Sequence, residues 1–238
     1  KGMNRPRDEL AELFKFRANA RVDLKRFSEA KQDYDTVLAI MEEGEKQSEK
    51  NGKATYMEYP DTFVQRGLCS EGLGKWEDAI ADYSRAIQLW GGGREQGVNP
   101  YVLTFRANAL AKLGRYSDAL LDYEAADRMF VALRDEARAL DVRANYALAR
   151  YQVGQTKEAT KMMTDIVRRN PGYTDMHVAL AAIAWSAGDR ETAESEWEFA
   201  CNKIQTGCSL YRDMDWLSTV RRWPPSMVAN MKQFLGKK

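Results

Sequence analysis

The sequence contains little of what most metal and cofactor sites are made of. Its 238 residues include one histidine and three cysteines, which is little material for a cluster of metal ligands, so we expect no metal. No glycine-rich loop stands between a strand pattern and a helix pattern, as a phosphate-binding loop would, and we expect no cofactor. Proline is also scarce, with six residues, while alanine, leucine, glutamate, lysine and arginine are plentiful, which indicates helices.

Two further absences concern partners. The 36 Lys and Arg residues are balanced by 35 Asp and Glu residues, so charge gives no reason to expect nucleic acid or a strongly anionic membrane as the main partner. No apolar run approaches the roughly 18 residues of a membrane-spanning helix, and we expect no transmembrane segment. The first residues, KGMNRPRDELAEL, lack the apolar core of a secretory signal, so we expect a targeting segment to be absent or already removed.

What the sequence does contain is an internal repeat. The word FRANA occurs at residues 16–20 and 105–109, and a shifted form, RANYA, occurs at 143–147. In both full copies the first alanine lies at the same distance ahead of a turn, whereas RANYA is out of register. We therefore interpret FRANA as part of a structural unit and RANYA as a coincidence of composition.

The unit is defined by a small residue that is followed twelve positions later by alanine, with a turn between these two anchors. The five anchor pairs are Ala18/Ala30, Gly67/Ala79, Ala107/Ala119, Ala147/Ala159 and Ala181/Ala193. Two helices joined by such a turn fold back on each other, and only small residues fit where their axes come closest. Because each hairpin has an apolar face that only a neighbouring hairpin can bury, the pattern predicts a stack of hairpins.

Two segments, residues 63–89 and 101–127, resemble the tetratricopeptide repeat. In the first of them, the family's positions are occupied by Phe63, Gly67, Gly74, Trp76, Ala79, Tyr83 and Ala86. The resemblance implies an all-α, right-handed superhelical solenoid, with five repeats within residues 1–205 and capping helices within residues 206–238.

The resemblance is uneven along the chain. The first repeat has Lys25 in place of the turn glycine, and the fourth departs from the family at Thr156 and Met163. Successive first anchors are 49, 40, 40 and 34 residues apart, against 34 in the family. We interpret the segments EKQSEKNGKATYMEYP and GGGREQGVNP as insertions between repeats.

Charged residues recur at two positions of the repeat. Three repeats place arginine before the first anchor and aspartate before the large residue of the second helix: Arg17, Arg66 and Arg106, with Asp33, Asp82 and Asp122. The fourth repeat lacks both groups. This joint presence and joint loss predicts structural ion pairs, formed either within a hairpin or between successive hairpins, for example between Asp82 and Arg106.

The resemblance also implies a binding surface, because the first helices of stacked hairpins line the concave side of the solenoid. The residues that flank the anchors there are Lys15, Phe16, Asn19, Gln65, Tyr101, Phe105, Asn108, Asn145 and Trp185. Amides bond a peptide backbone and aromatic rings hold its side chains, so we interpret these residues as partner-binding. The alternative is that they pack on neighbouring repeats or loops.

Some members of the family bind a partner's C-terminal carboxylates through a clamp of Lys, Asn and Arg residues. Lys15 and Asn19 stand where that clamp begins, but Gln65 replaces its second Asn. Tyr101 and Phe105 stand where the clamp needs Lys and Arg. We therefore do not expect this chain to bind acidic C-terminal tails in that way.

The histidine and the cysteines have structural interpretations. His177 lies at an apolar helix position beside VALAAIAW, which favours a packing role, and the carboxylates are scattered, so we expect no catalysis. Cys69 falls inside a predicted helix, where a buried thiol is expected. Gly207 can turn the chain back so that Cys208 approaches Cys201, which leaves a disulfide and two free thiols as alternatives.

The C-terminal stretch ends in a predicted helix that follows Pro224 and Pro225. One apolar stripe runs along this helix: Met227, Val228, Met231, Phe234 and Leu235. The stripe either packs on the fifth repeat as a cap or docks on a partner, and in the second case Met231 and Phe234 are partner-binding residues. The ending is similar to that of plastid tetratricopeptide proteins, some of them in the thylakoid lumen, which implies a chloroplast location beside photosynthetic membrane complexes.

The sequence therefore predicts a non-catalytic scaffold or assembly factor that binds other proteins, among them subunits of a photosynthetic membrane complex. The alternative is a permanent structural subunit of a large, photosystem-type complex. In an oxidising lumen we expect Cys201 and Cys208 to form a disulfide, and in a reducing compartment we expect both to stay free.

Overall fold

A computed structural model describes residues 7–50, 59–91 and 98–236 of the chain. Every regular element within these ranges is a helix, so the expected all-α fold is confirmed. Contacts divide the chain into two units, Lys1–Leu113 and Gly114–Lys238, called unit 1 and unit 2 below. The expected boundary at residue 205 falls inside unit 2, and most of the two proposed insertions lies outside the described residues.

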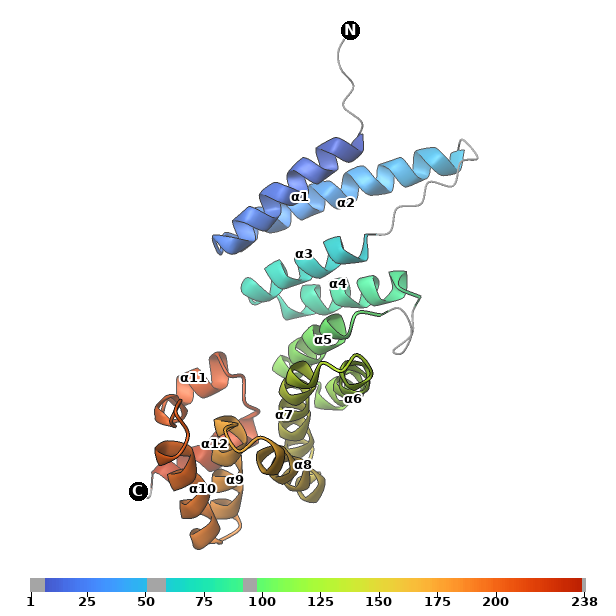
Figure 1. Cartoon of the computed structure of the whole chain (residues 1–238). Helices are drawn as coiled ribbons and strands as arrows, with labels where there is room; N and C mark the ends of the chain where they lie inside the picture. The colour runs from blue at the N-terminus through green and yellow to red at the C-terminus, as the bar shows by residue number, and fades with distance from the viewer. Residues whose placement is uncertain (1–6, 51–58, 92–97, 237–238) are drawn as a thin grey trace. The chain divides into compact units, whose positions relative to one another are not determined.

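Unit 1 is built from antiparallel helix pairs that stack on one another (Figure 1). Its helices are α1 (Arg7–Asp23), α2 (Phe27–Lys50), α3 (Pro60–Gly72), α4 (Trp76–Leu89) and α5 (Pro100–Lys112). α1 packs on α2 and α3 packs on α4, which makes the first two hairpins. The stack continues because α2 packs on α3 and α4 packs on α5.

Unit 2 continues the pattern and adds the C-terminal segment. Its helices are α6 (Tyr116–Ala132), α7 (Glu136–Gln152), α8 (Thr156–Arg169), α9 (Thr174–Ser186), α10 (Arg190–Asn202), the 3-10 turn η1 (Ser209–Arg212), α11 (Met214–Thr219) and α12 (Pro225–Leu235). α7 pairs with α8, α9 pairs with α10, and α12 packs on α9 and α7. No described helix has both the length and the apolar character needed to cross a bilayer.

The anchors lie where the sequence pattern requires small residues. All nine anchor alanines have no exposed surface, and Gly67 is buried as well. At Gly67 a Cβ atom would lie 2.6 Å from the Cε1 atom of Tyr83, so the tyrosine ring fills the space that a side chain would need. The small anchor and the large residue of the repeat are therefore one packing unit.

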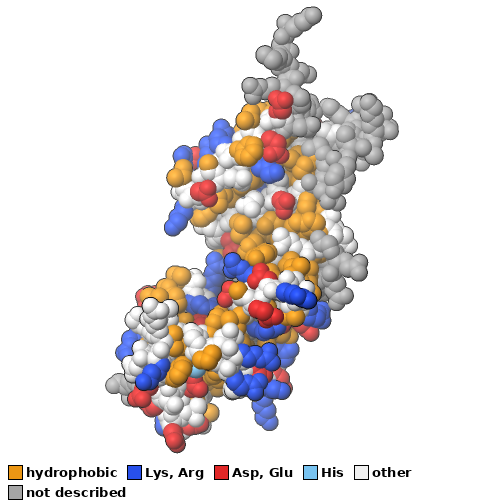
Figure 2. Space-filling view, in the orientation of Figure 1, with side chains coloured by type: hydrophobic (Ala, Val, Ile, Leu, Met, Phe, Trp, Pro, Cys, Tyr) orange, Lys and Arg blue, Asp and Glu red, His pale blue; other side chains and the backbone are white. Residues whose placement is uncertain are grey.

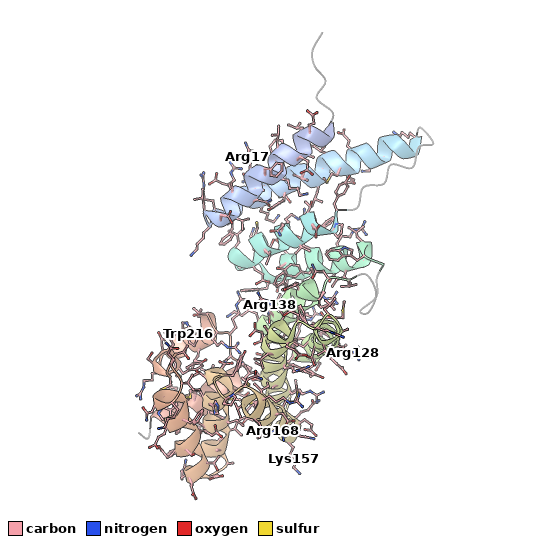
Figure 3. All side chains as sticks on the ribbon, viewed as in Figure 1. Arg17, Arg128, Arg138, Lys157, Arg168 and Trp216 are labelled. Carbon is pink, nitrogen blue, oxygen red and sulfur yellow. A yellow bond between two sulfur atoms is a disulfide. The ribbon has the colours of Figure 1, made fainter. Side chains whose placement is uncertain are left out.

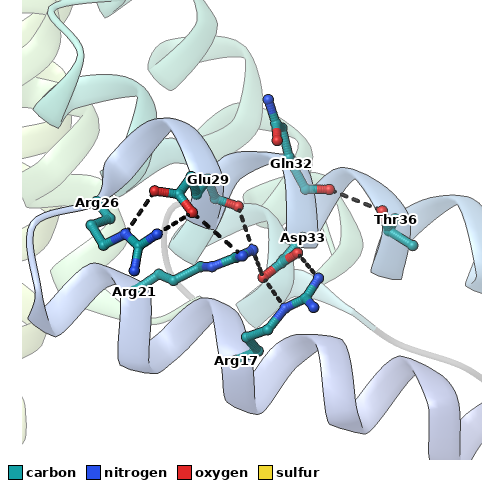
Figure 4. A network of polar contacts seen from close by, with 7 residues as sticks. All are labelled: Arg17, Arg21, Arg26, Glu29, Gln32, Asp33 and Thr36. Atoms are coloured by element: carbon teal, nitrogen blue, oxygen red, sulfur yellow. Dashed lines mark hydrogen bonds and ion pairs between the residues drawn. The ribbon is translucent and has the colours of Figure 1, made fainter.

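The repeated Arg and Asp residues meet within the hairpins. Arg17 on α1 donates to both carboxylate oxygens of Asp33 on α2, at 2.9 and 2.6 Å. Arg66 on α3 binds Asp82 on α4 in the same way, at 3.0 and 2.5 Å. Figure 4 shows that Arg21 also reaches Asp33, so this carboxylate accepts from two guanidinium groups.

The same arginine position also ties one hairpin to the next. Arg66 Nη1 donates to Asp35 of the preceding hairpin at 2.8 Å, and Arg106 Nη1 donates to Ser84 at 3.1 Å. Asp35 and Ser84 both lie two residues after the repeated aspartate. The contact between hairpins is thus accepted by the residue two positions after the aspartate, whereas Asp82 itself pairs with the arginine of its own hairpin.

The two pairs differ electrostatically. Hydrogen bonds from Arg17 hold the pKa of the Asp33 carboxyl below its usual value. Burial raises the pKa of Asp82, and the opposing hydrogen bond from Arg66 does not cancel that effect. Burial by itself would lower the pKa of Arg66, yet its bonds to Asp82 raise it, so the two groups stay paired while burial opposes the charge on Asp82. The Asp82 pair therefore fixes register more surely than it adds stability.

The C-terminal helix is part of the core of unit 2. Met227, Met231 and Phe234 have no exposed surface. The Phe234 ring lies between two indoles, 5.3 Å from Trp185 and 5.4 Å from Trp197. Met231 and Phe234 are therefore core residues. Of the two alternatives for the apolar stripe of α12, the structure agrees with packing as a cap, because these side chains are buried against unit 2 and are not available to a partner.

The turn after the first helix of each hairpin gives a test of the repeat register. Lys25 adopts a φ of 57° where the second repeat has Gly74 at 71°. A left-handed residue with a side chain is strained, so Lys25→Gly should raise the free energy of unfolding by on the order of 0.5–1 kcal/mol. Gly74→Lys is the matched reverse change, since a Cβ there meets nothing within 4 Å, and it should destabilise by about 1 kcal/mol. Urea unfolding that shows both changes to be neutral would contradict the aligned turns.

A double-mutant cycle tests the pairing within a hairpin. Asp82→Ala and Arg66→Ala should together cost less than the sum of the single changes, with a coupling of about 1 kcal/mol or more. The matched cycle of Asp82→Ala with Arg106→Ala should be additive within about 0.5 kcal/mol. Additive losses of stability in the Arg66 cycle, measured by chemical unfolding, would show that Asp82 and Arg66 are not coupled.

Candidate functional site

In each unit, the candidate site is the surface formed by the first helices of its hairpins. We define this first-helix surface by the residues six and two positions before the first anchor. In unit 1 these are Glu12 and Phe16 on α1, Asp61 and Gln65 on α3, and Tyr101 and Phe105 on α5; in unit 2 they are Asp141 and Asn145 on α7, and Asp175 and Ala179 on α9. A carboxylate occupies the position six before the anchor in four of the five repeats.

In unit 1 this surface is open to solvent. The Phe16 side chain is 64% exposed and Tyr101 is 38% exposed. Phe105 is half-buried, because its ring lies 5.9 Å from that of Tyr83. The space-filling view shows hydrophobic side chains reaching the surface between charged ones over this part of the chain (Figure 2).

The polar residues of the same surface are held to different degrees. Asn19 accepts a hydrogen bond from the Tyr34 hydroxyl at 2.5 Å, so its amide is oriented by the core of the hairpin. Lys15 lies 3.5 Å from Glu12 and partly neutralises that carboxylate. Asp61 is exposed, and no side chain within the described ranges pairs with it. Among its described residues, unit 1 thus presents exposed aromatic rings and an exposed carboxylate that no described side chain pairs with.

In unit 2 two residues of the equivalent surface, Asp175 and Asn145, bind the chain's own C-terminal segment, while Asp141 stays exposed. Arg221 donates to both oxygens of Asp175, at 2.9 and 2.5 Å, and to Asn145 Oδ1 at 2.9 Å. The Trp223 indole donates to Asp175 as well, at 3.1 Å. Asp175 is consequently buried, with 6% of its surface exposed.

Further hydrogen bonds hold the residues after this arginine. The backbone N–H of Ser226 donates to Gln152 at 2.9 Å, and the Asn230 amide donates to the Tyr151 hydroxyl at 2.6 Å. Figure 3 places Trp216 on α11 within the same segment, where its ring lies 5.4 Å from Tyr211. The C-terminal segment therefore contacts the last turn of α7 as well as Asn145 and Asp175.

The charge pair in this covered site is strongly coupled. Burial by itself would lower the pKa of Arg221, yet the adjacent Asp175 carboxylate raises it above its usual value. Burial also raises the pKa of the Tyr173 and Tyr211 hydroxyls, with Asp175 adding to the effect. Arg221 thus stays charged and paired, which fixes the register of the C-terminal segment on α7 and α9.

Two residues proposed for partner binding are engaged inside unit 2. Asn145 accepts from Arg221, and Trp185 packs on Phe234. The Arg190 guanidinium also lies 3.5 Å from the centre of the Trp185 ring. The chain itself occupies these two positions, so in this structure they bind the C-terminal segment rather than a partner.

Sequence reasoning missed Asp175, Arg221 and Trp223. The recurring carboxylate six residues before the anchor was the available signal for Asp175. Nothing local identified Arg221 as its partner, since 46 residues separate the two.

The remaining predicted groups are structural. His177 is buried between the Glu196 carboxylate, 2.5 Å from Nδ1, and the Pro171 carbonyl, 3.0 Å from Nε2. A disulfide joins Cys201 to Cys208 at the start of the C-terminal segment, and Cys69 is a buried free thiol. Among the described residues, no group of three or more His, Cys, Asp or Glu side chains could hold a metal ion.

No protein-family model matches this sequence. Solved structures resemble it over most of its length. MamA is 14% identical with a TM-score of 0.59, and the match covers 76% of this chain and 91% of that one. YrrB, described as a TPR protein with an unusual peptide-binding site, is 16% identical with a TM-score of 0.59, covering 81% and 85%.

PilF from Pseudomonas aeruginosa covers still more of the chain. It is 14% identical with a TM-score of 0.61, and the match covers 97% of this chain and 92% of that one. At such identities the likeness shows the fold alone. Together with the anchors and turns described above, it shows that this chain has the fold of a tetratricopeptide-repeat solenoid.

Proposed function

We propose that this chain is a non-catalytic scaffold or assembly factor that binds a segment of a partner protein on the first-helix surface of unit 1. One contrast carries the proposal. The aromatic residues Phe16 and Tyr101 are open to solvent in unit 1, while Asp175 and Asn145, at equivalent positions of unit 2, bind the chain's own C-terminal segment. Within the described residues, these rings of unit 1 are therefore left for a partner to bind.

The chemistry of the open surface suits an extended peptide. Phe16, Tyr101 and Phe105 offer rings that can hold side chains, and Gln65 offers an amide for the peptide backbone. Interface energy concentrates in a few aromatic and arginine anchors, so the exposed Phe16 ring is the strongest single candidate. The likeness to YrrB, a TPR protein with a peptide-binding site, supports the same class of ligand.

Replacing the two phenylalanines tests the surface. Phe16→Ala with Phe105→Ala should weaken partner binding by roughly 2 kcal/mol or more in total, since both remove anchor rings. Phe16→Ala alone should account for a measurable part of the loss and should leave the stability of the fold unchanged. Leu133→Ala is the matched control, because Leu133 is a similarly exposed apolar residue (65%) on a turn of unit 2. The measurement is quantitative mass spectrometry of proteins retained by each variant from the native source.

The outcomes separate the two interpretations of these rings. If Phe16→Ala unfolds the chain, the ring is part of the core and the surface is not a binding site. If the variant folds and retains the same proteins as Leu133→Ala does, partners bind elsewhere and the proposal is wrong.

The proposal extends to the compartment: a chloroplast location, in the thylakoid lumen, beside a photosynthetic membrane complex. The similarity of the chain's ending to plastid proteins supports it, and so does the Cys201–Cys208 disulfide, because disulfides persist in oxidising compartments. We expect peptide mapping of the native protein without reduction to find these two cysteines linked and Cys69 alkylatable after unfolding. Finding Cys201 and Cys208 free in protein from the lumen would contradict this assignment.

The alternative function, a permanent structural subunit of a photosystem-type complex, is favoured by one observation. Leu10, Leu13 and Phe16 on α1 are all exposed apolar residues, and a permanent partner subunit would bury them. A purified chain that is soluble and monomeric favours the scaffold, and one that is insoluble without its complex favours the permanent subunit.

A further inference from the structure

Unit 2 shows what its first-helix surface binds. The guanidinium of Arg221 binds two residues on successive first helices. One lies six positions before the anchor of its helix, and the other lies two positions before the anchor of the preceding first helix. These are Asp175 on α9 and Asn145 on α7, with three hydrogen bonds of 2.5–2.9 Å between them and Arg221. The arginine is followed two residues later by Trp223, which shares the same carboxylate.

Aligning the repeats on their anchors gives the equivalent residues in unit 1. The residue six before the anchor of α3 is Asp61, and the residue two before the anchor of α1 is Phe16. Asp61 therefore corresponds to Asp175, and Phe16 corresponds to Asn145. The carboxylate is kept, while the amide is replaced by an aromatic ring.

This exchange retains the capacity to bind a guanidinium. A carboxylate accepts two parallel hydrogen bonds from arginine, and the planar cation also stacks on an aromatic ring. Both groups are available, because Phe16 is 64% exposed and no described side chain pairs with Asp61. The other nearby carboxylate, Glu12, is already approached by Lys15 at 3.5 Å.

We propose that Asp61 and Phe16 form an arginine subsite on unit 1, and that its occupant is an extended partner segment in which an arginine is followed closely by an aromatic residue. The inference rests on the proposed function and deepens it, since it names the chemistry of the segment. The chain's own sequence Arg221-Arg222-Trp223 is the pattern of that segment, seen already bound in unit 2.

Asp61 also has a structural role, which the experiment must distinguish from arginine binding. It lies in the first turn of α3, where a carboxylate offsets the helix dipole. Asp78 lies in the first turn of α4, is likewise exposed, and stands outside the first-helix surface. Asp78→Asn is therefore the matched control for Asp61→Asn.

The probe is a fluorescein-labelled peptide with the sequence of residues 217–226, LSTVRRWPPS, titrated with the full chain and followed by fluorescence anisotropy. Asp61→Asn and Phe16→Ala should each weaken binding by about tenfold, the size typical of a charge-assisted pair or an aromatic anchor. Asp78→Asn should bind as the unaltered chain does. A peptide with citrulline in place of its first arginine should bind the unaltered chain and Asp61→Asn equally.

Each other result overturns the inference. Absence of binding, or binding that Asp61→Asn leaves unchanged, removes the subsite. If Asn145→Ala weakens binding and Asp61→Asn does not, the peptide exchanges with the chain's own segment on unit 2. If Asp61→Asn has no effect on the peptide but Phe16→Ala still reduces retention of native partners, the arginine subsite is wrong and the proposed function stands.

Discussion

The close crossing of two helices at small residues is the constraint on which the rest of the structure depends. At Gly67 a single added Cβ would lie 2.6 Å from the Tyr83 ring, so the hairpin closes only if that position stays small. Fixing the crossing also fixes which residues of the first helix face the second helix and which do not. The residues six and two positions before the anchor recur at the same helical positions of each first helix, so equivalent side chains can be compared between the two units.

The arginine before the anchor converts this packing into a defined stack. In unit 1 the Arg66 guanidinium binds Asp82 of its own hairpin and Asp35 of the preceding one. One side chain therefore holds the two helices of a hairpin together and also fixes that hairpin on its neighbour. The pKa of Asp33 is lowered by its arginine hydrogen bonds, while burial raises the pKa of Asp82. The pairs therefore differ in net energy, and what they share is a geometry that only the correct register satisfies.

The sequence predicted the hairpins because anchors and turns are local signals, separated by a dozen residues. It could not predict which first-helix surface would be covered. The contact between Arg221 and Asn145 joins residues 76 positions apart, and no local pattern encodes it. The apolar stripe of α12 has the same sequence pattern whether it caps a repeat or binds a partner, so the sequence left both roles open for Met231 and Phe234, which are buried in the structure. Asp35 was missed for a similar reason, since its partner Arg66 lies in the next hairpin.

Within the described residues, the C-terminal segment binds Asp175 and Asn145 on the first-helix surface of unit 2, while Phe16 and Tyr101 of unit 1 stay exposed. Hydroxyl-radical footprinting of the purified chain measures this directly, one side chain at a time. The account predicts fast labelling of Phe16 and Tyr101 together with protection of Trp223, Met227 and Met231, although tryptophan and methionine are intrinsically reactive. Labelling of Met231 and Trp223 at the rate of the unfolded chain, with Phe16 protected, would contradict it.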